Sequence, residues 1–345
     1  MNIDTFEINN GKTFIIAELS ANHNQDFSLA VRTIKAAKKA GADAIKLQTY
    51  KPESLTIEAD TPYFSEKTEG LWKGYTPYEL YKEAQTPWEW QPKLKEIAEK
   101  EGLVFFSSPF DFEGVDFLND MEVPAYKIAS FEITDIPLIK YAASKMKPII
   151  LSTGIATLSD IENAVNACKE VGNNEIIILK CTSSYPASYT EINLKTIPSI
   201  PTVFATLVGI SDHTMGGSVS IAAVALGACI VEKHFIMDRS LGGPDSAFSM
   251  EPDEFKQMVD SIRIVEQSLG RINFNLTEST VKSRNTRRSL FIVKDIKKGE
   301  LFTSDNTRSI RPGNGLEPKY YDDIIGKKST KDIKKGMPLK WDMIS

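Results

Sequence analysis

The sequence predicts an α/β fold, a (β/α)8 or TIM barrel followed by a small β-rich domain. Three observations predict it. Eight short apolar runs alternate with helical stretches, and each run ends in polar side chains. After about residue 275 this alternation stops, and a polar and basic stretch follows. Eight such units close into a parallel barrel through right-handed crossovers. An open doubly wound sheet is the alternative, but no run is followed by the glycine-rich turn of a dinucleotide site.

The expected strands are short and rich in β-branched and aromatic residues. They cover residues 13–19, 43–50, 103–109, 125–132, 148–154, 176–184, 207–213 and 229–235. Between most of them, apolar residues recur at helical spacing, and several of these stretches end in glycine. Helices are therefore expected over residues 28–42, 91–102, 136–146, 159–172 and 216–228.

A long insertion, residues 52–90, separates the second and third expected strands and carries three of the four tryptophans. In a barrel it would hang over the face where active sites lie, as a lid or substrate loop. A surface that contacts a partner protein is an equally good interpretation of the same segment.

The chain divides into an expected barrel domain (1–275), a polar and basic linker (276–288) and a C-terminal module (289–345). The module contains an internal echo, because "KDIKKGELF" (294–302) returns as "KDIKKGMPL" (331–339). Repeats of this kind indicate a small β-rich module built from two similar halves. A module of this size is marginal alone and would gain stability from packing on something larger.

The composition is that of an ordinary soluble enzyme, with 41% hydrophobic residues and a formal net charge of −5 over 345 residues. No charged tail argues for nucleic acid or a membrane surface, and no apolar run is long enough to span a membrane. The N-terminus lacks the pattern of a signal peptide. Cys168, Cys181 and Cys229 are expected to be reduced thiols in a cytoplasmic protein, with a packing role for Cys181.

The polar residues at the strand ends form a candidate site, because the carboxyl ends of barrel strands carry active sites. In chain order they are Glu18; Lys46 and Gln48; Ser107 and Ser108; Lys127, Ser130 and Glu132; Ser152 and Thr153; Thr182, Ser183, Ser184 and Tyr185; Ser211, Asp212 and His213; Glu232 and His234. A lysine inside a strand needs a partner, because burying an unpaired ammonium group is costly. Two lysines among many hydroxyls suit a phosphate or carboxylate ligand.

Two of the three histidines, His213 and His234, end successive strands. Their imidazoles can converge on one ion, and two imidazoles with a carboxylate or water suit a divalent transition metal. The alternative is that each is a buried histidine with a satisfied hydrogen bond. Glu18, Glu232 and Asp245 are carboxylates that could complete the metal shell or act as a base. His23 is either a loop ligand or a neighbour of a helix cap.

The motifs resemble, in order and over nearly the whole chain, the sialic acid synthase family. They are "FIIAELSANHNQDFSLA", "AGADAIKLQTY", "FFSSPFD", "AYKIASFE", "ILSTGIAT", "KCTSSYP", "GISDHTMG", "ALGACIVEKHF" and "PDSAFSMEPDEF". The stretch from "KDIKKGELF" through "IRPGNGL" is similar to the family's C-terminal SAF module, which resembles type III antifreeze protein.

Within the family, "AELSANH", "ESLTI", "GLWKGYTPYELY" and "TPWEW" resemble the pseudaminic acid synthase branch. Neuraminate synthases usually have threonine where this chain has Ser108 and asparagine where it has Ser183. They present an aromatic residue in the stretch that contains Arg287 and Arg288. The departures argue against a neuraminate synthase and leave the phosphoenolpyruvate site intact.

The resemblance implies condensation of phosphoenolpyruvate with 2,4-diacetamido-2,4,6-trideoxy-L-altrose to give pseudaminic acid and phosphate, by C–O cleavage. It also implies a divalent metal, Mn²⁺ or else Mg²⁺ or Co²⁺. The metal would assist attack on the open-chain sugar aldehyde. Family members form a homodimer in which the C-terminal module of one chain covers the barrel mouth of the other.

The resemblance also assigns roles to individual residues. His213 and His234 hold the metal, and Glu18 moves a proton to or from the attacking water. The residues implied for the phosphate and carboxylate are Lys46, Ser108, Lys127, Ser130, Ser152, Ser183 and Ser211. Those implied for the same face and the sugar are Gln48, Glu132, Tyr185 and Asp245. Arg311 would reach an N-acetyl group from the partner chain; without the resemblance it is a surface arginine beside a turn.

Three other functions fit parts of the pattern. The same mechanism could make N-acetylneuraminate or legionaminate. An aldol-type or isomerase barrel could use the two histidines without phosphoenolpyruvate, although the two lysines count against it. A carbohydrate- or ice-binding protein with an inactive barrel would not need the histidine pair and Glu18.

Overall fold

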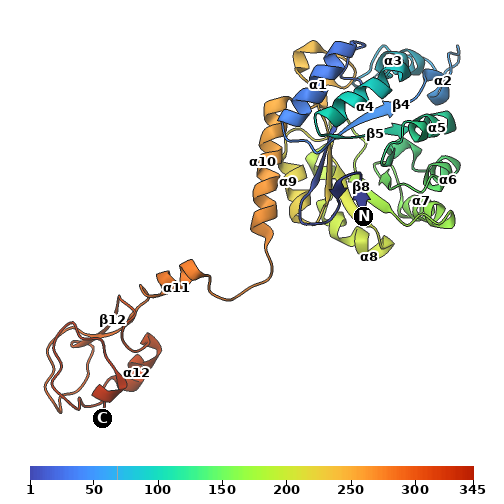
Figure 1. Cartoon of the computed structure of the whole chain (residues 1–345). Coiled ribbons are helices and arrows are strands. Elements are labelled where there is room, and N and C mark those ends of the chain that lie inside the picture. The colour runs from blue at the N-terminus through green and yellow to red at the C-terminus, as the bar shows by residue number, and fades with distance from the viewer. Residues whose placement is uncertain (68) are drawn as a thin grey trace. The chain divides into compact units, whose positions relative to one another are not determined.

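The computed structural model describes residues 1–67 and 69–345, so Thr68 of the insertion lies outside the described residues. The chain forms two compact units, Met1–Gly270 and Arg271–Ser345 (Figure 1). The predicted boundaries at residues 275 and 288 stay a prediction. Across the described residues, no helix is both long and apolar enough to cross a membrane.

The first unit is a closed barrel of eight parallel strands, which confirms the predicted (β/α)8 fold. The strands are β3 (Phe14–Glu18), β4 (Ala44–Thr49), β5 (Val104–Pro109), β6 (Tyr126–Ile128), β7 (Ile149–Ser152), β8 (Ile176–Cys181), β9 (Leu207–Ser211) and β10 (Ile230–His234). The barrel closes because β10 pairs with β3, the first of these strands. Nearly every strand residue is buried, as expected when helices cover the outside of a parallel sheet.

Helices follow the strands and cover the barrel (Figure 1). They are α1 (Phe27–Lys39), α2 (Pro52–Leu55), α3 (Pro77–Ala84), α4 (Gln91–Lys100), α5 (Phe112–Asp120), α6 (Ile136–Ser144), α7 (Leu158–Glu170), α8 (Ile200–Phe204), α9 (Ser218–Ala225) and α10 (Pro252–Leu269). The sequence interpretation missed α5 and α10. It also placed no element between residues 184 and 207, where α8 is short in a segment that contains Pro198 and Pro201.

All eight strands are shorter than the expected runs, and at three of them this changes the placement of residues implied for the site. The run 125–132 forms strand only over β6, and Ser130–Glu132 is a single 3₁₀ turn. The run 176–184 ends as strand at Cys181. The run 207–213 ends as strand at Ser211. Ser130, Glu132, Ser183 and His213 therefore reach the barrel mouth from loops and not from strands, which corrects their predicted placement.

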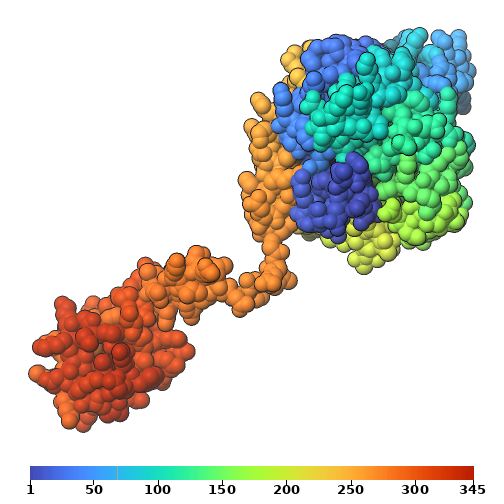
Figure 2. Space-filling view, in the orientation of Figure 1, coloured from blue at the N-terminus to red at the C-terminus, as the bar shows by residue number. Residues whose placement is uncertain are grey.

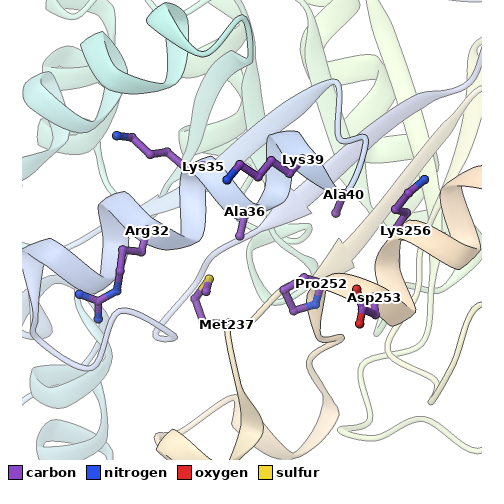
Figure 3. Close-up of a pocket in the computed structure, with 9 residues that line it drawn as sticks. All are labelled: Arg32, Lys35, Ala36, Lys39, Ala40, Met237, Pro252, Asp253 and Lys256. Atoms are coloured by element: carbon purple, nitrogen blue, oxygen red, sulfur yellow. The ribbon is translucent and has the colours of Figure 1, made fainter.

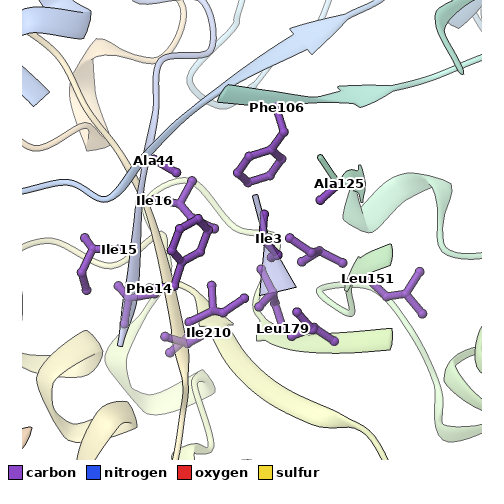
Figure 4. Packing of buried hydrophobic residues seen from close by; sticks show 14 of the residues in the cluster. Ile3, Phe14, Ile15, Ile16, Ala44, Phe106, Ala125, Leu151, Leu179 and Ile210 are labelled. Atoms are coloured by element: carbon purple, nitrogen blue, oxygen red, sulfur yellow. The ribbon is translucent and has the colours of Figure 1, made fainter. Parts of the chain in front are cut away.

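The core fills the barrel and the layer between barrel and helices. Figure 4 shows side chains from facing strands packed together, among them Phe14, Phe106, Leu179 and Ile210. A short hairpin, β1 (Asn2–Ile3) and β2 (Phe6–Glu7), precedes the barrel and appears dark blue in Figure 2. Ile3 is fully buried, and the Phe6 ring lies 4.7 Å from the Phe14 ring at the start of β3. The hairpin thus packs at the amino ends of the strands, away from the polar carboxyl ends.

The second unit contains α11 (Glu278–Arg284), α12 (Tyr321–Ile324) and an antiparallel pair, β11 (Ser289–Ile292) and β12 (Thr307–Ile310). The two sequence repeats pair with each other. Ile296 and Ile333 exchange backbone hydrogen bonds of 2.9 and 2.8 Å. Two ion pairs of 2.8 Å, Lys297–Asp332 and Lys334–Asp295, complete the symmetric contact. The internal echo therefore builds the small apolar core of a β-rich module, as predicted.

Candidate active site

Four charged side chains form a buried cluster at the carboxyl ends of the strands. Lys46 Nζ lies 2.7 Å from Glu18 Oε2 and 3.9 Å from Glu232 Oε1. Lys127 Nζ lies 3.7 Å from the same Glu232 oxygen. Each of the four side chains is at most 5% exposed. The two lysines predicted to need partners therefore have carboxylate partners, of which Glu232 serves both.

Strand register places these groups together. Glu18 is level with Lys46 on β4 and with His234 on β10, because β3 pairs with both neighbours. Residues at alternate positions of a strand point to the same face, so Glu232 and His234 both face the barrel mouth. Gln48, two residues after Lys46, donates from Nε2 to Glu18 Oε1 at 3.2 Å.

The two carboxylates of the cluster have different protonation behaviour. Burial raises the pKa of Glu18 to about 7, with Glu232 adding to the effect and Lys46 opposing it. Burial also favours the neutral form of Glu232, but Lys127 and Lys46 outweigh it and lower the pKa of that carboxyl group. Paired carboxyl groups with separated pKa values divide acid–base and electrostatic roles between them. Glu18 is thus the group that can exchange a proton near neutral pH.

Serine hydroxyls from three strands and one loop surround the cluster. Lys46 Nζ donates to Ser108 Oγ at 3.2 Å, and Ser211 Oγ donates to Glu232 Oε1 at 3.2 Å. Ser152 Oγ and Ser183 Oγ are buried and have no hydrogen-bond partner within the described part of the chain. Buried hydroxyls of this kind ordinarily have a partner. These two hydroxyls could donate hydrogen bonds to a ligand that accepts them, such as phosphate or carboxylate.

A glycine makes room for these hydroxyls. Gly154 N donates to Ser130 Oγ at 3.0 Å. A Cβ built on Gly154 would lie 2.0 Å from Ser183 Oγ and 2.8 Å from Ser130 Oγ. Any side chain at Gly154 would therefore displace both serines from the edge of the cluster.

His213 and His234 lie side by side, with ring centroids 5.3 Å apart. Thr182 O lies 3.0 Å from His213 Nδ1. Because a carbonyl only accepts, Nδ1 carries a proton. Burial opposes protonation of His213, but Cys181 and Thr182 O outweigh it and raise the pKa of the ring. Burial and the neighbouring positive charges of His213 and Lys46 hold the pKa of His234 well below its usual value. A neutral imidazole is the form that binds metal.

The histidine pair fits a divalent metal as two ligands of a larger shell. His234 Nδ1 is buried and makes no hydrogen bond to any residue that the structure describes, while Asp245 Oδ2 lies 3.9 Å away. Over residues 1–67 and 69–345, no group of three or more His, Cys, Asp or Glu side chains is arranged to hold a metal ion. A bound cation would therefore complete its coordination with water or substrate oxygens.

A second buried ion pair lies beside the histidines. Lys233 Nζ is 2.9 Å from Asp212 Oδ2, and both side chains are at most 1% exposed. Asp212 also accepts from Thr214 N and Oγ1 at 2.8 and 2.7 Å. Asp212 directly precedes His213 and Lys233 directly precedes His234, so the pair ties together the two chain segments that present the imidazoles.

A cavity of about 370 Å³ opens next to the histidines. One part of its lining is polar and comes from Ser20, Gln48, Lys67, Ser130, Glu132, His234 and Asp245. The other part is largely aromatic and aliphatic and comes from Tyr50, Leu55, Trp72, Leu80, Tyr81, Phe110, Phe131, Tyr185 and Pro244. The insertion 52–90 supplies several of these side chains, which favours its interpretation as a substrate loop.

Most of the predicted site residues lie around this cluster and cavity. Tyr185 packs on His213 with ring centroids 4.4 Å apart. Asp245 Oδ2 accepts from Ser20 Oγ at 2.5 Å, and Ser20 also accepts from Gln48 Nε2 at 2.9 Å. Burial raises the pKa of Glu132 to about 7. The catalytic and binding roles of these residues stay predictions.

Arg311, Arg287 and Arg288 belong to the C-terminal unit and are exposed in it. Their predicted contacts with the sugar stay predictions. Sequence reasoning missed two other features of the site. Ser20 lies two residues after Glu18, beyond the end of the strand, and was not among the predicted site residues. Cys181 Sγ lies 3.8 Å from His213 Nδ1, a contact that no spacing along the chain reveals.

His23 does not join the other two histidines. Its side chain is fully buried, and Nδ1 accepts from Gln25 N at 3.1 Å. Its Nε2 lies 3.2 Å from Thr86 Oγ1, so the ring ties the loop after β3 to the end of the insertion. The possible role of His23 as a metal ligand at the histidine pair is therefore wrong, because its imidazole is already satisfied elsewhere.

His23 predicts a specific loss of stability in acid. Burial lowers its pKa from 6.5 to about 4, so the unfolded chain binds this proton more readily than the folded one. The contribution of His23 is intact above pH 6.5 and falls between pH 6.5 and about 4, by about 3 kcal/mol in total. Urea unfolding at pH 7 and pH 5 should show a smaller pH dependence for His23→Asn than for the unchanged protein. Equal pH dependence would rule out this role.

A second pocket, of about 550 Å³, lies between α1 and the start of α10 (Figure 3). Arg32, Lys35, Lys39 and Lys256 contribute its positive charge, and all four are exposed. Three of them have carboxylate partners. Arg32 lies 3.9 Å from Asp26, Lys35 lies 4.0 Å from Glu101, and Lys256 lies 2.7 Å from Asp260. Its solvated charges contrast with the buried charges at the strand ends, which make the better candidate for catalysis.

Comparisons with known proteins agree with this placement. The NeuB family matches residues 33–273, and the SAF domain matches residues 287–345. Pseudaminic acid synthase of Campylobacter jejuni is 49% identical over 95% of this chain and 96% of its own length. The N,N'-diacetyllegionaminic acid synthase of the same bacterium is 40% identical over 94% of this chain and 97% of its own length.

A solved structure agrees with the fold. N-acetylneuraminic acid synthetase from Leptospira borgpetersenii, crystallised with citrate, has a TM-score of 0.73 and 34% identity. The match covers 83% of this chain and 96% of that one. The resemblance noted in the motifs is thereby confirmed, and the chain belongs to the NeuB family, with a SAF domain at its C-terminus.

Proposed function

We propose that this protein is a transferase that condenses phosphoenolpyruvate with 2,4-diacetamido-2,4,6-trideoxy-L-altrose, giving pseudaminic acid and phosphate. The observation that carries the reaction class is the buried cluster of Lys46 and Lys127 beside unpaired serine hydroxyls, next to a histidine pair. The choice of sugar is supported by the higher identity to a pseudaminic acid synthase than to a legionaminic acid synthase.

The lysines and serines would bind the phosphate and carboxylate of phosphoenolpyruvate. Lys46 and Lys127 supply two positive charges in a buried site, where electrostatic interactions are stronger than at the surface. Ser152 and Ser183 have free hydroxyls to donate, and Ser108, Ser130 and Ser211 line the same region. An arriving anion would share the lysines with Glu18 and Glu232.

His213 and His234 would hold the divalent metal, Mn²⁺ or else Mg²⁺ or Co²⁺. When bound, the metal supplies Lewis-acid polarisation of the sugar aldehyde. The residues around it orient the imidazoles, through Thr182 O on one ring and the buried Asp212–Lys233 pair between the two segments.

The chemistry forms one carbon–carbon bond and breaks one carbon–oxygen bond. C3 of phosphoenolpyruvate attacks the aldehyde carbon, which leaves positive charge at C2. Water adds at C2, and the tetrahedral intermediate expels phosphate. Glu18 accepts the proton of that water, since its pKa of about 7 lets it exchange a proton at neutral pH. Glu232, held as an anion between two lysines, keeps those ammonium groups oriented toward the substrate.

The sugar would occupy the cavity beside the histidines. Gln48, Glu132 and Asp245 offer hydrogen bonds to its hydroxyl and amide groups, and Tyr185 offers an aromatic face. Its aldehyde end would lie toward His234, because that residue marks where the cavity meets the charged cluster.

The C-terminal module would cover the barrel mouth of a second chain in a homodimer and bring Arg311 to the sugar. Opposite net charges support association of the two units. Residues 271–345 contain 17 Lys and Arg against 9 Asp and Glu, whereas residues 1–270 contain 24 against 37. Electrostatic complementarity of this kind favours correct docking and speeds it.

Deleting residues 286–345 tests this cover. The barrel unit has its own core, so the truncated protein should stay folded by circular dichroism. The loss of Arg311 and the cover should raise the KM for the sugar about tenfold or more, the size expected for a lost charged hydrogen bond. A truncated enzyme with unchanged kinetics for the sugar would refute the cover.

The proposed function is tested by phosphate release from phosphoenolpyruvate with Mn²⁺ and three sugars. These are N-acetylmannosamine and the altro and manno forms of the 2,4-diacetamido-2,4,6-trideoxy hexose. Release with the altro sugar alone supports the proposal. Preference for a manno sugar would indicate neuraminate or legionaminate synthesis. No release with any sugar would favour an aldol-type barrel or an inactive carbohydrate-binding protein.

A further inference from the structure

We propose that Trp72, in the insertion between β4 and α4, determines which sugar the enzyme accepts. This inference rests on the proposed function and deepens it. Trp72 forms part of the apolar wall of the cavity and would contact the methyl-bearing end of the sugar, where a trideoxy diacetamido sugar differs from a polyhydroxylated one.

The position of Trp72 is set by a contact across the cavity. Its indole Nε1 donates to Pro244 O at 2.9 Å. Pro244 directly precedes Asp245, which accepts from Ser20 and lies 3.9 Å from His234 Nδ1. The hydrogen bond therefore joins the insertion to the segment that carries a predicted sugar ligand, 172 residues further along the chain.

The Trp72 ring also faces an aromatic neighbour that reaches the histidines. Its centroid lies 5.9 Å from the ring of Tyr185, which packs on His213 at 4.4 Å. Lys67 Nζ lies 4.8 Å from the centre of the indole. Aromatic and cation–π contacts of this kind fix a ring in place. The Trp72 ring is thus held in a defined position relative to Tyr185 and the histidine pair.

Trp72 belongs to the aromatic and aliphatic part of the cavity lining, with Lys67 beside it. A sugar with a hydroxyl at C4 and a hydroxymethyl group at C5 would place polar groups against the indole, whose one N–H already donates to Pro244 O. A sugar with an acetamido group at C4 and a methyl group at C5 would place methyl groups there. Discrimination by an apolar wall of this kind reaches about tenfold to two-hundredfold per group. Trp72 is therefore suited to selecting the deoxy, diacetamido class.

The test compares Trp72→Ala and Trp72→Phe with the unchanged full-length enzyme, using Mn²⁺, phosphoenolpyruvate and two sugars. Trp72→Ala should raise the KM for the diacetamido sugar about tenfold with kcat within about threefold. The ratio of kcat/KM between that sugar and N-acetylmannosamine should fall at least tenfold. Trp72→Phe keeps the aromatic face but loses the hydrogen bond to Pro244 O. Its selectivity ratio should lie between those of Trp72→Ala and the unchanged enzyme.

Leu71→Ala is the matched control, because Leu71 is 44% exposed and is absent from the cavity lining. It should leave the selectivity ratio unchanged. An active enzyme whose selectivity ratio survives Trp72→Ala overturns the role of Trp72 alone. An unchanged enzyme that is inactive with every sugar overturns the proposed function and this inference together. A fall in the kcat of Trp72→Ala with an unchanged selectivity ratio would also overturn the role of Trp72, since a general loss of structure affects both sugars equally.

Discussion

Replacing His234 by alanine is expected to lower phosphate release from phosphoenolpyruvate by about a thousandfold or more. The physical reason is the loss of one of two imidazoles that lie 5.3 Å apart and would hold the metal. Lewis-acid stabilisation is worth several kcal/mol, and each 1.4 kcal/mol corresponds to about tenfold in rate. Mn²⁺ affinity, measured by electron paramagnetic resonance of the free ion, should fall in parallel. This second readout does not depend on turnover.

His23→Asn is the control for that experiment. His23 is a buried histidine of the same barrel, but its hydrogen bonds go to Gln25 and Thr86 and not to the site. This variant should bind Mn²⁺ as the unchanged protein does at pH 7. Near-full activity or unchanged Mn²⁺ affinity in His234→Ala, with an intact circular dichroism spectrum, would refute the metal role of His234.

Replacing Glu18 by glutamine is expected to lower kcat by about a hundredfold to ten-thousandfold, the range for loss of a positioned general base. Glutamine keeps the size of the side chain and can still contact Lys46, but it cannot take up the proton of the attacking water. Rapid-quench measurement of a single turnover would show whether the chemical step is the one that slows.

The same variant should keep its affinity for phosphoenolpyruvate. Lys46 and Lys127 remain, and Lys46 loses a competing negative charge at 2.7 Å. Isothermal titration with phosphoenolpyruvate should therefore give a Kd equal to or lower than that of the unchanged enzyme. A Glu18→Gln enzyme with more than about a third of the original kcat would exclude Glu18 as the proton-transfer group.

Much of the fold was predictable because its signals are local. The apolar runs of the barrel predicted all eight strands, and the repeat in the C-terminal module predicted two paired halves. Errors arose where an element ends. The run 125–132 is uniformly compatible with a strand, but only Tyr126–Ile128 pairs with neighbouring strands. Pairing is a property of two segments, so one segment alone does not reveal where it stops.

The candidate site was predictable residue by residue but not as an arrangement. The sequence indicated that Glu18, Lys46, Lys127 and His234 stand at strand ends. It also made Glu232 only one of several possible carboxylates for a metal, whereas the structure places it between two lysines. Trp72 was counted within a lid, and its contact with Pro244 O was invisible because 172 residues separate the two.

The sequence by itself determined the eight alternating units, the polar residues that end them, and the family to which the chain belongs. The tertiary structure alone decided that β10 closes onto β3, which brings Glu18 level with His234 although 216 positions separate them. It also decided which groups are buried, and burial is what raises the pKa of Glu18 to about 7 and lowers that of His23 to about 4. The physical reason is that each residue's type can be read from the sequence alone. The pairing of strands, the distances between side chains and the burial of charged groups arise only when distant segments pack together.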